Sequence, residues 1–203
     1  MRGLYLITND DPLNILLQKL AVALATRKIA ILQYRRKKIA PIDQLDEVAK
    51  IKILCEEFSV PLVINDDIDL AEKYALGVHL GQSDGEISQA KTRLAANAII
   101  GRTCLNSLDL AQKAIAEGAT YVAFGAIYAT STKPEAGCIG LDVLQQASQQ
   151  FDVPICAIGG LTVENADVVI KAGADLCAVI SDILSLNLED IPKRINAWAN
   201  LFV

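Results

Sequence analysis

Residues 154–181 read PICAIGGLTVENADVVIKAGADLCAVIS and contain one complete strand–helix–strand unit. Two aliphatic runs, 154–159 and 176–181, predict short buried strands. Thr162 between them is typical of a helix start, and the Gly173-Ala174 pair marks the point where that helix should end. Strands that alternate with helices favour a parallel sheet covered by helices.

The same alternation extends outward from this unit through the whole chain, with no Pro/Gly/Ser-rich linker to divide it. Eight strand–helix repeats in roughly 200 residues fit the compact end of the (β/α)8 barrel range. A doubly wound open sheet is the rival architecture, but it normally has fewer strands, and no G-x-G-x-x-G follows the first one. We predict an α/β fold, a single-domain TIM barrel over residues 1–203. Its strand candidates are 3–8, 29–35, 61–65, 77–81, 98–103, 121–127, 154–159 and 176–181.

Composition narrows the classes of function. Hydrophobic residues make up 52% of the 203 residues and aromatic residues only 5%, which fits an aliphatic core between helices and a parallel sheet. The net charge of −5, without a basic stripe, argues against nucleic acid as the main partner. No apolar run reaches the roughly 18 residues of a membrane span, and the first residues lack a signal-peptide layout. We therefore expect a soluble, cytoplasmic protein without a membrane partner. The five scattered cysteines favour reduced core residues over a disulfide framework or a zinc site; they are Cys55, Cys104, Cys138, Cys156 and Cys177.

Barrel enzymes place their sites where the strands end, so polar residues there are the candidates. The second strand candidate passes from Ile29-Ala30-Ile31-Leu32 into Gln33-Tyr34-Arg35-Arg36-Lys37. Because side chains alternate faces with period two, Gln33, Arg35 and Lys37 should project together into the mouth of the barrel, that is, its open end at the carboxyl ends of the strands. A helix cap with solvated charges is the alternative interpretation.

Two carboxylates follow neighbouring strand candidates, Asp66 after the third and Asp84 after the fourth. Each alone would most often cap a helix or face solvent. Together over one mouth, beside cations suited to phosphate, they predict Mg²⁺ ligands, since magnesium commonly takes one or two carboxylates plus phosphate and water. His79, the only histidine, is interpreted as a hydrogen-bonded residue of the mouth rather than a base. Cys104 and Cys138 also fall near the mouth and are interpreted as incidental.

Phosphate chemistry is indicated at three further places. The stretch 125–134 (GAIYATSTKP) carries hydroxyls and the ammonium of Lys133 after a strand, although a Ser/Thr turn with a solvated lysine would look the same. The seventh strand candidate ends at Gly159-Gly160, which permits close backbone approach, and the eighth ends at Ile180-Ser181. Barrels frequently hold a phosphate with the loops after these two strands.

Taken in order, these segments resemble the thiamine-phosphate synthase (thiamin phosphate pyrophosphorylase) family over nearly the whole chain. Each motif is modest alone, but five in order at strand ends form a strong signal. Thr103 stands where the family usually has serine, Ser83 replaces a common acidic residue, and Arg36 occupies a position that is often acidic. The motifs are QYRRK (33–37), IND (64–66), GVHLGQSD (77–84), TSTKP (130–134), and AIGG followed by EN (157–165).

The resemblance implies a transferase that joins a hydroxymethylpyrimidine diphosphate to a thiazole phosphate, giving thiamine phosphate and pyrophosphate. It implies Mg²⁺ on Asp66 and Asp84, and no organic cofactor. It implies catalytic roles for Arg35, Lys37, Thr103 and Lys133, which would grip the diphosphate. The pyrimidine would be held by Gln33 and Asn65, and the thiazole phosphate by Thr130, Thr132, Gly160, Ile180 and Ser181.

Two other functions remain open at this stage. A thiazole tautomerase is a relative that moves protons and needs no pyrophosphate site, so Asp66, Asp84, Arg35 and Lys133 argue against it. A non-catalytic sensor of thiamine phosphates should carry an extra arm, a basic helix or a large apolar patch, and none is evident. The expected partners are thus two small-molecule substrates. The oligomeric state is left open, with a homo-oligomer as one option.

Overall fold

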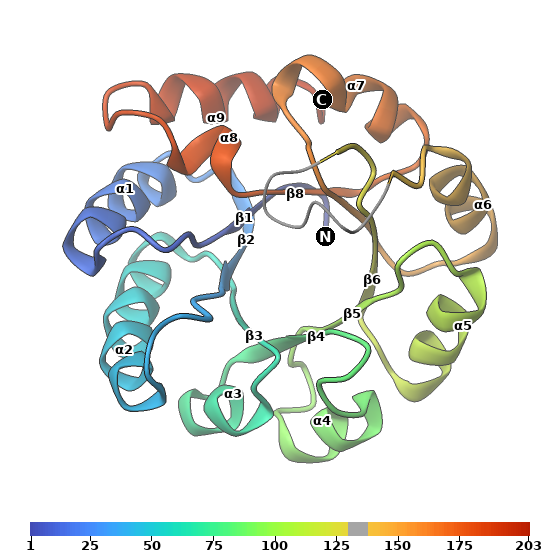
Figure 1. The fold of residues 1–203 in the computed structure, drawn as a ribbon, viewed down its shortest axis with the longest axis horizontal. Helices are drawn as coiled ribbons and strands as arrows, with labels where there is room; N and C mark the ends of the chain where they lie inside the picture. The colour runs from blue at the N-terminus through green and yellow to red at the C-terminus, as the bar shows by residue number, and fades with distance from the viewer. Residues whose placement is uncertain (130–137) are drawn as a thin grey trace.

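A computed structural model describes residues 1–129 and 138–203 of the chain. The described strands are all parallel and close into a barrel in sequence order, from β1 to β8 and back to β1. Figure 1 looks down this barrel, with the helices in a ring around it. The predicted TIM barrel is confirmed, and every strand lies within its predicted range. The strands are β1 Gly3–Ile7, β2 Ile29–Tyr34, β3 Leu62–Asn65, β4 Gly77–Leu80, β5 Ile100–Thr103, β6 Tyr121–Phe124, β7 Ile155–Ile158 and β8 Leu176–Val179.

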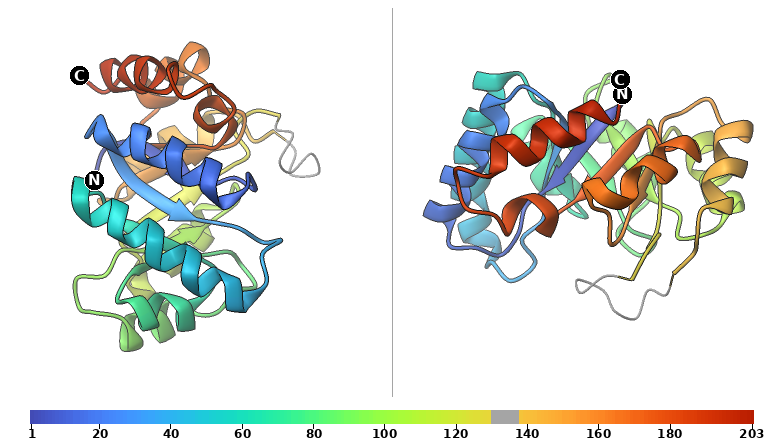
Figure 2. Two further views of the ribbon diagram at one scale, coloured as in Figure 1. Left: turned by 90° about the vertical axis from the view of Figure 1, so that its left-hand side faces the viewer. Right: turned by 90° about the horizontal axis from the view of Figure 1, so that it is seen from above.

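A helix follows each strand and covers the outside of the barrel, as the side views in Figure 2 show. Side chains cap two of these helices at their start: the Asp67 side chain accepts from Leu70 N at 2.8 Å, and Ser107 Oγ accepts from Leu110 N at 3.2 Å. Thr162 forms a capping box with Asn165. The helices are α1 Leu13–Ala25, α2 Pro41–Phe58, α3 Ile68–Tyr74, α4 Ile87–Arg93, α5 Leu108–Glu117, α6 Asp142–Gln150, α7 Val163–Lys171, α8 Ser181–Leu184 and α9 Ile191–Asn200.

The core has two layers because each strand points alternate side chains outward and inward. The larger layer lies between strands and helices and contains Leu6, Leu32 and Trp198, all fully buried. The smaller layer fills the barrel and contains Tyr5, Ile31 and Tyr121. Tyr5 and Tyr121 carry hydroxyls into this mostly aliphatic interior, and those hydroxyls need hydrogen-bond partners there. No helix among the described residues combines the length and apolar character that crossing a membrane demands.

Candidate active site at the carboxyl ends of the strands

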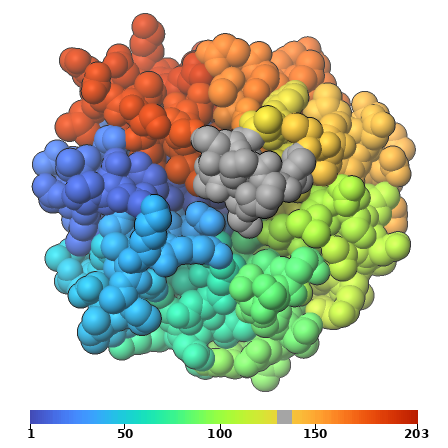
Figure 3. Space-filling view, viewed as in Figure 1, coloured from blue at the N-terminus to red at the C-terminus, as the bar shows by residue number. Residues whose placement is uncertain are grey.

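The residues that follow the strands gather at one end of the barrel. Figure 3 views this end, where the segments after β2 (light blue), β4 (green) and β8 (orange-red) lie around the centre. Of the candidate residues, Thr130, Thr132 and Lys133 lie outside the described residues. The remaining candidates all follow or end the strands β2, β3, β4, β5, β7 and β8.

At the end of β2, successive side chains point to opposite faces of the strand, as its period of two requires. The Gln33 side chain points into the barrel, where its Nε2 donates to the Tyr5 hydroxyl at 2.7 Å. Tyr34 points the opposite way, and its hydroxyl donates to Glu47 Oε2 on α2 at 2.7 Å. Arg36 also faces Glu47, with its Nε 2.7 Å from Oε2. Residues 33, 35 and 37 therefore share the face opposite to α2.

Buried contacts hold this segment in its extended path. Arg36 and Glu47 pair through two hydrogen bonds, of 2.7 and 3.0 Å, and the Arg36 Nη1 donates to the carbonyl of Asn9 at 2.8 Å. Thr8, after β1, accepts from Arg35 N at 2.8 Å through its hydroxyl, and its own N–H donates to Gln33 O at 3.0 Å. These bonds fix the backbone of Arg35, whose guanidinium forms no salt bridge with any described residue.

The two candidate carboxylates face one point. Asp66 Oδ1 accepts from Gly81 N at 3.4 Å, and a Cβ placed on Gly81 would lie 3.8 Å from Asp66 Oδ1 and only 2.3 Å from Asp84 Oδ2. Position 81 must therefore be glycine for both carboxylates to approach each other. The backbone of Asp66 has a φ of +67°, a left-handed conformation that aspartate tolerates better than most residues and that often accompanies functional sites.

Lys37 and Asn65 hold the first of these carboxylates. Lys37 Nζ lies 2.8 Å from Asp66 Oδ2, and Asn65 Nδ2 donates to the same oxygen at 2.6 Å. Burial alone would raise the pKa of Asp66, but Lys37 outweighs it and lowers that pKa below its usual range. Burial and the neighbouring Asp66 charge raise the pKa of Asp84. Among the described residues, Lys37 is the lysine that pairs with this like-charge pair of carboxylates.

This pair suits a hard divalent cation, which prefers carboxylate and water oxygens. Among the described residues, no group of three or more His, Cys, Asp and Glu side chains could hold a metal ion. A cation between Asp66 and Asp84 would therefore draw most of its ligands from water or from oxygens of a bound substrate. That division of ligands is typical of Mg²⁺ at phosphate sites and unlike a structural zinc or calcium site.

The loop that carries Asp84 is held from below by β5. Arg102, whose exposure is 8%, donates from Nη1 to Gly85 O at 2.6 Å and from Nη2 to Gln82 O at 3.4 Å. Gln82 donates in turn to the Thr103 carbonyl. Thr103 ends β5, and its Oγ1 lies 2.9 Å from His79 Nε2.

His79 lies as its interpretation required, but the expectation for the cysteines was wrong in two respects: Cys138 is not a core residue, and Cys104 does not face the mouth. The other ring nitrogen of His79, Nδ1, is 2.7 Å from the Tyr121 hydroxyl, so both nitrogens have partners inside the barrel. Cys138 is exposed, whereas Cys104 is wholly buried in the layer between strands and helices, away from the mouth. Burial raises the pKa of the Cys104 thiol to about 12, which leaves it unreactive at neutral pH.

The ends of β7 and β8 form the opposite side of the mouth. Asn165 in the first turn of α7 donates from Nδ2 to Gly160 O at 2.9 Å and accepts from Thr162 N at 2.9 Å, which fixes the glycine turn. Ser181 is the first residue of the short α8, and Ile180 stands before it as the cap. Asp182 anchors α8 through Trp198 Nε1 at 2.6 Å. Gly160, Ile180 and Ser181 thus stand together at these strand ends.

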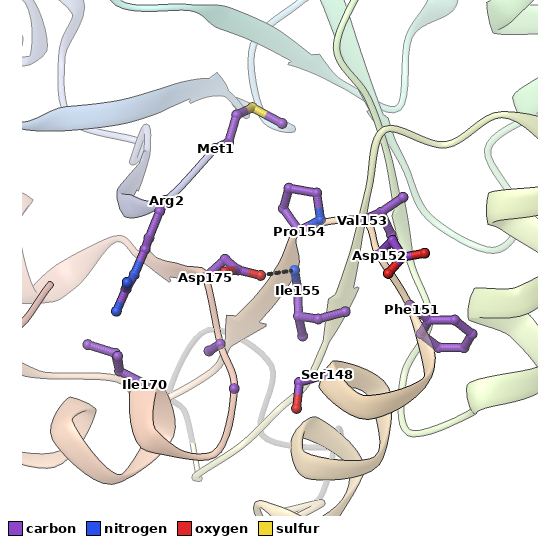
Figure 4. Close-up of a pocket in the computed structure, with 12 residues that line it drawn as sticks. Met1, Arg2, Ser148, Phe151, Asp152, Val153, Pro154, Ile155, Ile170 and Asp175 are labelled. Carbon is purple, nitrogen blue, oxygen red and sulfur yellow. Dashed lines mark hydrogen bonds between the residues drawn. The ribbon is translucent and has the colours of Figure 1, made fainter.

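The other end of the barrel carries a hollow of different character. It has a volume of about 620 Å³ and lies where β1, β7 and β8 begin. Figure 4 shows Asp175 accepting there from Ile155 N, at 2.9 Å, with Arg2 and Asp152 apart from each other. The carboxylate of Asp175 serves the backbone, and the charged side chains do not converge, so this hollow offers no comparable chemistry.

Several residues that support the site were missed from the sequence, among them Tyr5, Thr8, Glu47, Arg102 and Tyr121. Tyr5 and Tyr121 carry a usable signal, since each is a hydroxyl at an inward position of an aliphatic strand. Glu47 gives no signal, because a glutamate in an amphipathic helix normally faces solvent. Only the fold brings it against Arg36, where its exposure is 5%.

Known proteins match this chain over most of its length. Residues 4–183 match the model of a family described as thiamine monophosphate synthase. A thiamine-phosphate synthase from Azoarcus sp. (strain BH72) is 44% identical over 203 residues, covering 100% of this chain and 98% of that protein. A solved thiamine phosphate pyrophosphorylase from Pyrococcus furiosus superposes with a TM-score of 0.86 at 30% identity, covering 98% of this chain and 95% of that one. A second solved pyrophosphorylase of that name, from Bacteroides thetaiotaomicron, shares the fold, with a TM-score of 0.68, 15% identity, and coverage of 98% and 96%.

Proposed function

The chain belongs to the thiamine monophosphate synthase family, and we propose that it joins an aminopyrimidine diphosphate to a thiazole phosphate, releasing thiamine phosphate and pyrophosphate. The observation that carries the proposal is the Asp66–Asp84 pair with Lys37 at the mouth. A like-charge pair costs stability, and a substrate diphosphate would add to the repulsion unless a cation joined them. We therefore infer that this arrangement serves to bind a metal ion together with the phosphate oxygens of the substrate.

Magnesium is the metal that this donor set fits best, with Asp66 and Asp84 as its protein ligands. When bound, Mg²⁺ would neutralise charge on the diphosphate oxygens and hold them in place. Lys37 pairs with Asp66 at 2.8 Å, and with Mg²⁺ on that carboxylate the ammonium would be available to the diphosphate instead. With a side-chain exposure of 54%, Lys37 is free to make that exchange.

The chemistry asks the protein to stabilise a leaving group. The bond between the pyrimidine methylene carbon and the diphosphate oxygen breaks, and its electron pair leaves with pyrophosphate. The electron-rich aminopyrimidine supports the resulting carbocation, and the thiazole nitrogen donates its lone pair to form the new C–N bond. Arg35, Lys37, Lys133 and the hydroxyl of Thr103 would bind the departing diphosphate, where the negative charge grows in the transition state.

The other residues would orient the two rings, which lowers the entropic part of the barrier. Gln33 and Asn65 would contact the pyrimidine, since Gln33 is the last but one residue of β2 and Asn65 is the last residue of β3. The thiazole phosphate would bind across the mouth at Thr130, Thr132, Gly160, Ile180 and Ser181, where backbone N–H groups and hydroxyls can donate to it. The reaction requires neither a general base nor an organic cofactor. We propose a cytoplasmic location, which small-molecule substrates of a biosynthetic reaction would suit.

One assay tests the proposal against the tautomerase and the sensor. The protein is incubated with both substrates and Mg²⁺, and thiamine phosphate and pyrophosphate are quantified separately. We expect equal amounts of the two products and loss of both when EDTA removes the metal. Isomerised thiazole phosphate alone would instead indicate a tautomerase, and tight substrate binding without any product would indicate a sensor.

A further inference from the structure

A chain of hydrogen bonds crosses the inside of the barrel and joins two candidate substrate contacts. Gln33 Nε2 donates to the Tyr5 hydroxyl at 2.7 Å, and the Tyr5 and Tyr121 hydroxyls are 2.8 Å apart. The Tyr121 hydroxyl lies 2.7 Å from His79 Nδ1, and His79 Nε2 lies 2.9 Å from Thr103 Oγ1. The chain therefore runs from the end of β2 to the end of β5.

A missing side chain makes the middle of this chain possible. Gly101 on β5 stands between His79 on β4 and Tyr121 on β6 in the strand register. A Cβ on Gly101 would lie 2.1 Å from Tyr121 Cζ and 2.4 Å from its hydroxyl oxygen. With glycine there, the Tyr121 ring fills the gap and stacks on His79, with centroids 5.6 Å apart and planes 25° from parallel.

Burial makes the direction of each hydrogen bond matter. Tyr5 and Tyr121 are 1% and 0% exposed, so a hydroxyl proton without an acceptor would cost about 1–3 kcal/mol. No buried side-chain nitrogen or oxygen of the described residues lacks a hydrogen-bond partner. Burial also raises the pKa of both tyrosines, so their hydroxyls stay protonated.

One direction satisfies every member of the chain. The Gln33 Nε2 can only donate, so the Tyr5 oxygen accepts from it and the Tyr5 proton goes to Tyr121. Tyr121 must then donate to His79 Nδ1. The imidazole therefore carries its proton on Nε2 and donates it to Thr103.

We propose that Tyr5, Tyr121 and His79 form a positioning relay that sets the hydrogen-bonding direction of Gln33 and Thr103 toward the substrate. At one end, the Thr103 hydroxyl accepts from His79, so its proton is free to donate into the mouth. At the other end, Gln33 donates an N–H to Tyr5, and its Oε1, which accepts no hydrogen bond from any described residue, is available to a substrate donor.

The consequence for the reaction rests on the proposed function. A diphosphate only accepts hydrogen bonds, so Thr103 can help its departure only as a donor, which is the role that His79 leaves it. The exocyclic amino group of the pyrimidine donates, and it meets the Gln33 oxygen. The two ends of one relay thus match the two halves of one substrate, although the relay residues themselves lie beneath it.

The relay can be tested by determining the tautomer of His79, a measurement that does not depend on enzyme activity. His79 is the only histidine of the chain, so labelling with ¹⁵N-histidine gives one imidazole in long-range ¹H–¹⁵N spectra. At a pH of about 8.5, well above the ordinary pKa of histidine, we expect the full-length protein to show the proton on Nε2 and a hydrogen-bonded acceptor at Nδ1. A proton on Nδ1, or rapid exchange between the tautomers, would overturn the proposal. This outcome leaves the proposed reaction untouched.

Two variants separate the ends of the relay. Tyr121→Phe removes the partner of Nδ1, and we expect mixed tautomers and a loss of about tenfold to a hundredfold in kcat/KM, the usual effect of removing such a partner. Tyr5→Phe should keep the Nε2–H tautomer, because Tyr121 still donates to His79, but it should raise the KM for the pyrimidine diphosphate by releasing Gln33.

Tyr74→Phe is the matched control, since it removes a tyrosine hydroxyl that bonds the Leu45 carbonyl outside the barrel, at 2.7 Å. It should leave the His79 spectrum unchanged and kcat/KM within about twofold. If Tyr121→Phe fails to fold, the spectrum of the unchanged protein and of Tyr5→Phe still decides the direction of the chain. An unchanged tautomer and unchanged kinetics in a folded Tyr121→Phe would refute the relay, and product formation by the parent protein would show that the proposed function stands.

Discussion

Replacing Asp84 with asparagine should make the metal-free protein more stable and the enzyme inactive. The positions of Asp66 Oδ1 and Asp84 Oδ2 about Gly81 place the two oxygens within about 6 Å of each other. At 6 Å, Coulomb's law gives about 0.7 kcal/mol of repulsion in water and about 2.8 kcal/mol at an effective dielectric constant of 20. Lys37 offsets part of this repulsion through its contact with Asp66. We therefore expect Asp84→Asn to raise the free energy of unfolding by about 0.5–2 kcal/mol.

The assay is thermal unfolding of both proteins in EDTA and again with Mg²⁺ and pyrophosphate. Each kcal/mol shifts the Tm of a chain of this size by about 2–4 °C. The variant should melt higher in EDTA, while ligand binding should raise only the Tm of the parent protein. Asp46→Asn is the control, because it removes an exposed carboxylate that pairs with Lys50. It should change the free energy of unfolding by no more than about 0.5 kcal/mol, with or without the ligands. The reasoning fails if Asp84→Asn is the less stable protein in EDTA and gains as much from the ligands.

Three further predictions follow from buried and exposed ion pairs. Glu47→Gln leaves the buried Arg36 without its counter-charge and should cost about 3–5 kcal/mol in urea unfolding; a loss under 1 kcal/mol would contradict the anchoring role. Lys37→Met should cost less than about 1 kcal/mol, since the lysine is half exposed, yet reduce turnover strongly in a pyrophosphate-release assay, and normal turnover would remove Lys37 from the mechanism. Hydrogen bonds from Arg194 lower the pKa of Glu164 to about 2, so the stabilisation by this ion pair is present above the ordinary pKa of 4.5 and lost as pH falls toward 2. Glu164→Gln should therefore make the free energy of unfolding depend less on pH over that range. An identical pH profile in the variant and the parent protein would refute the role of this ion pair.

The fold was readable from the sequence because each strand is a short aliphatic run between clear helix signals. The runs 154–159 and 176–181 contain β7 and β8 completely, and Asp67, Ser107 and Thr162 cap the helices that follow their strands. Boundaries were less certain where two elements adjoin without a turn. Ser181 is an example, since it belongs to the strand candidate 176–181 but is the first residue of α8.

The mouth was readable only in part. Period two predicted correctly that Gln33 faces away from Tyr34 and Arg36, and strand order brought Asp66 and Asp84 together. The contacts that hold these residues join distant positions, such as Arg36 to Glu47 and Tyr5 to Tyr121, 116 residues apart. Such pairs follow from barrel closure, which no local pattern encodes. The roles of Thr130, Thr132 and Lys133 remain predictions.

Calorimetric titration of pyrophosphate tests the central claim most directly, because it asks whether the mouth binds the leaving group through a divalent ion. We predict that Mg²⁺ tightens pyrophosphate binding at least tenfold in the parent protein and has no such effect in Asp84→Asn. Equal affinity with Mg²⁺ and with EDTA in the parent protein would contradict the account.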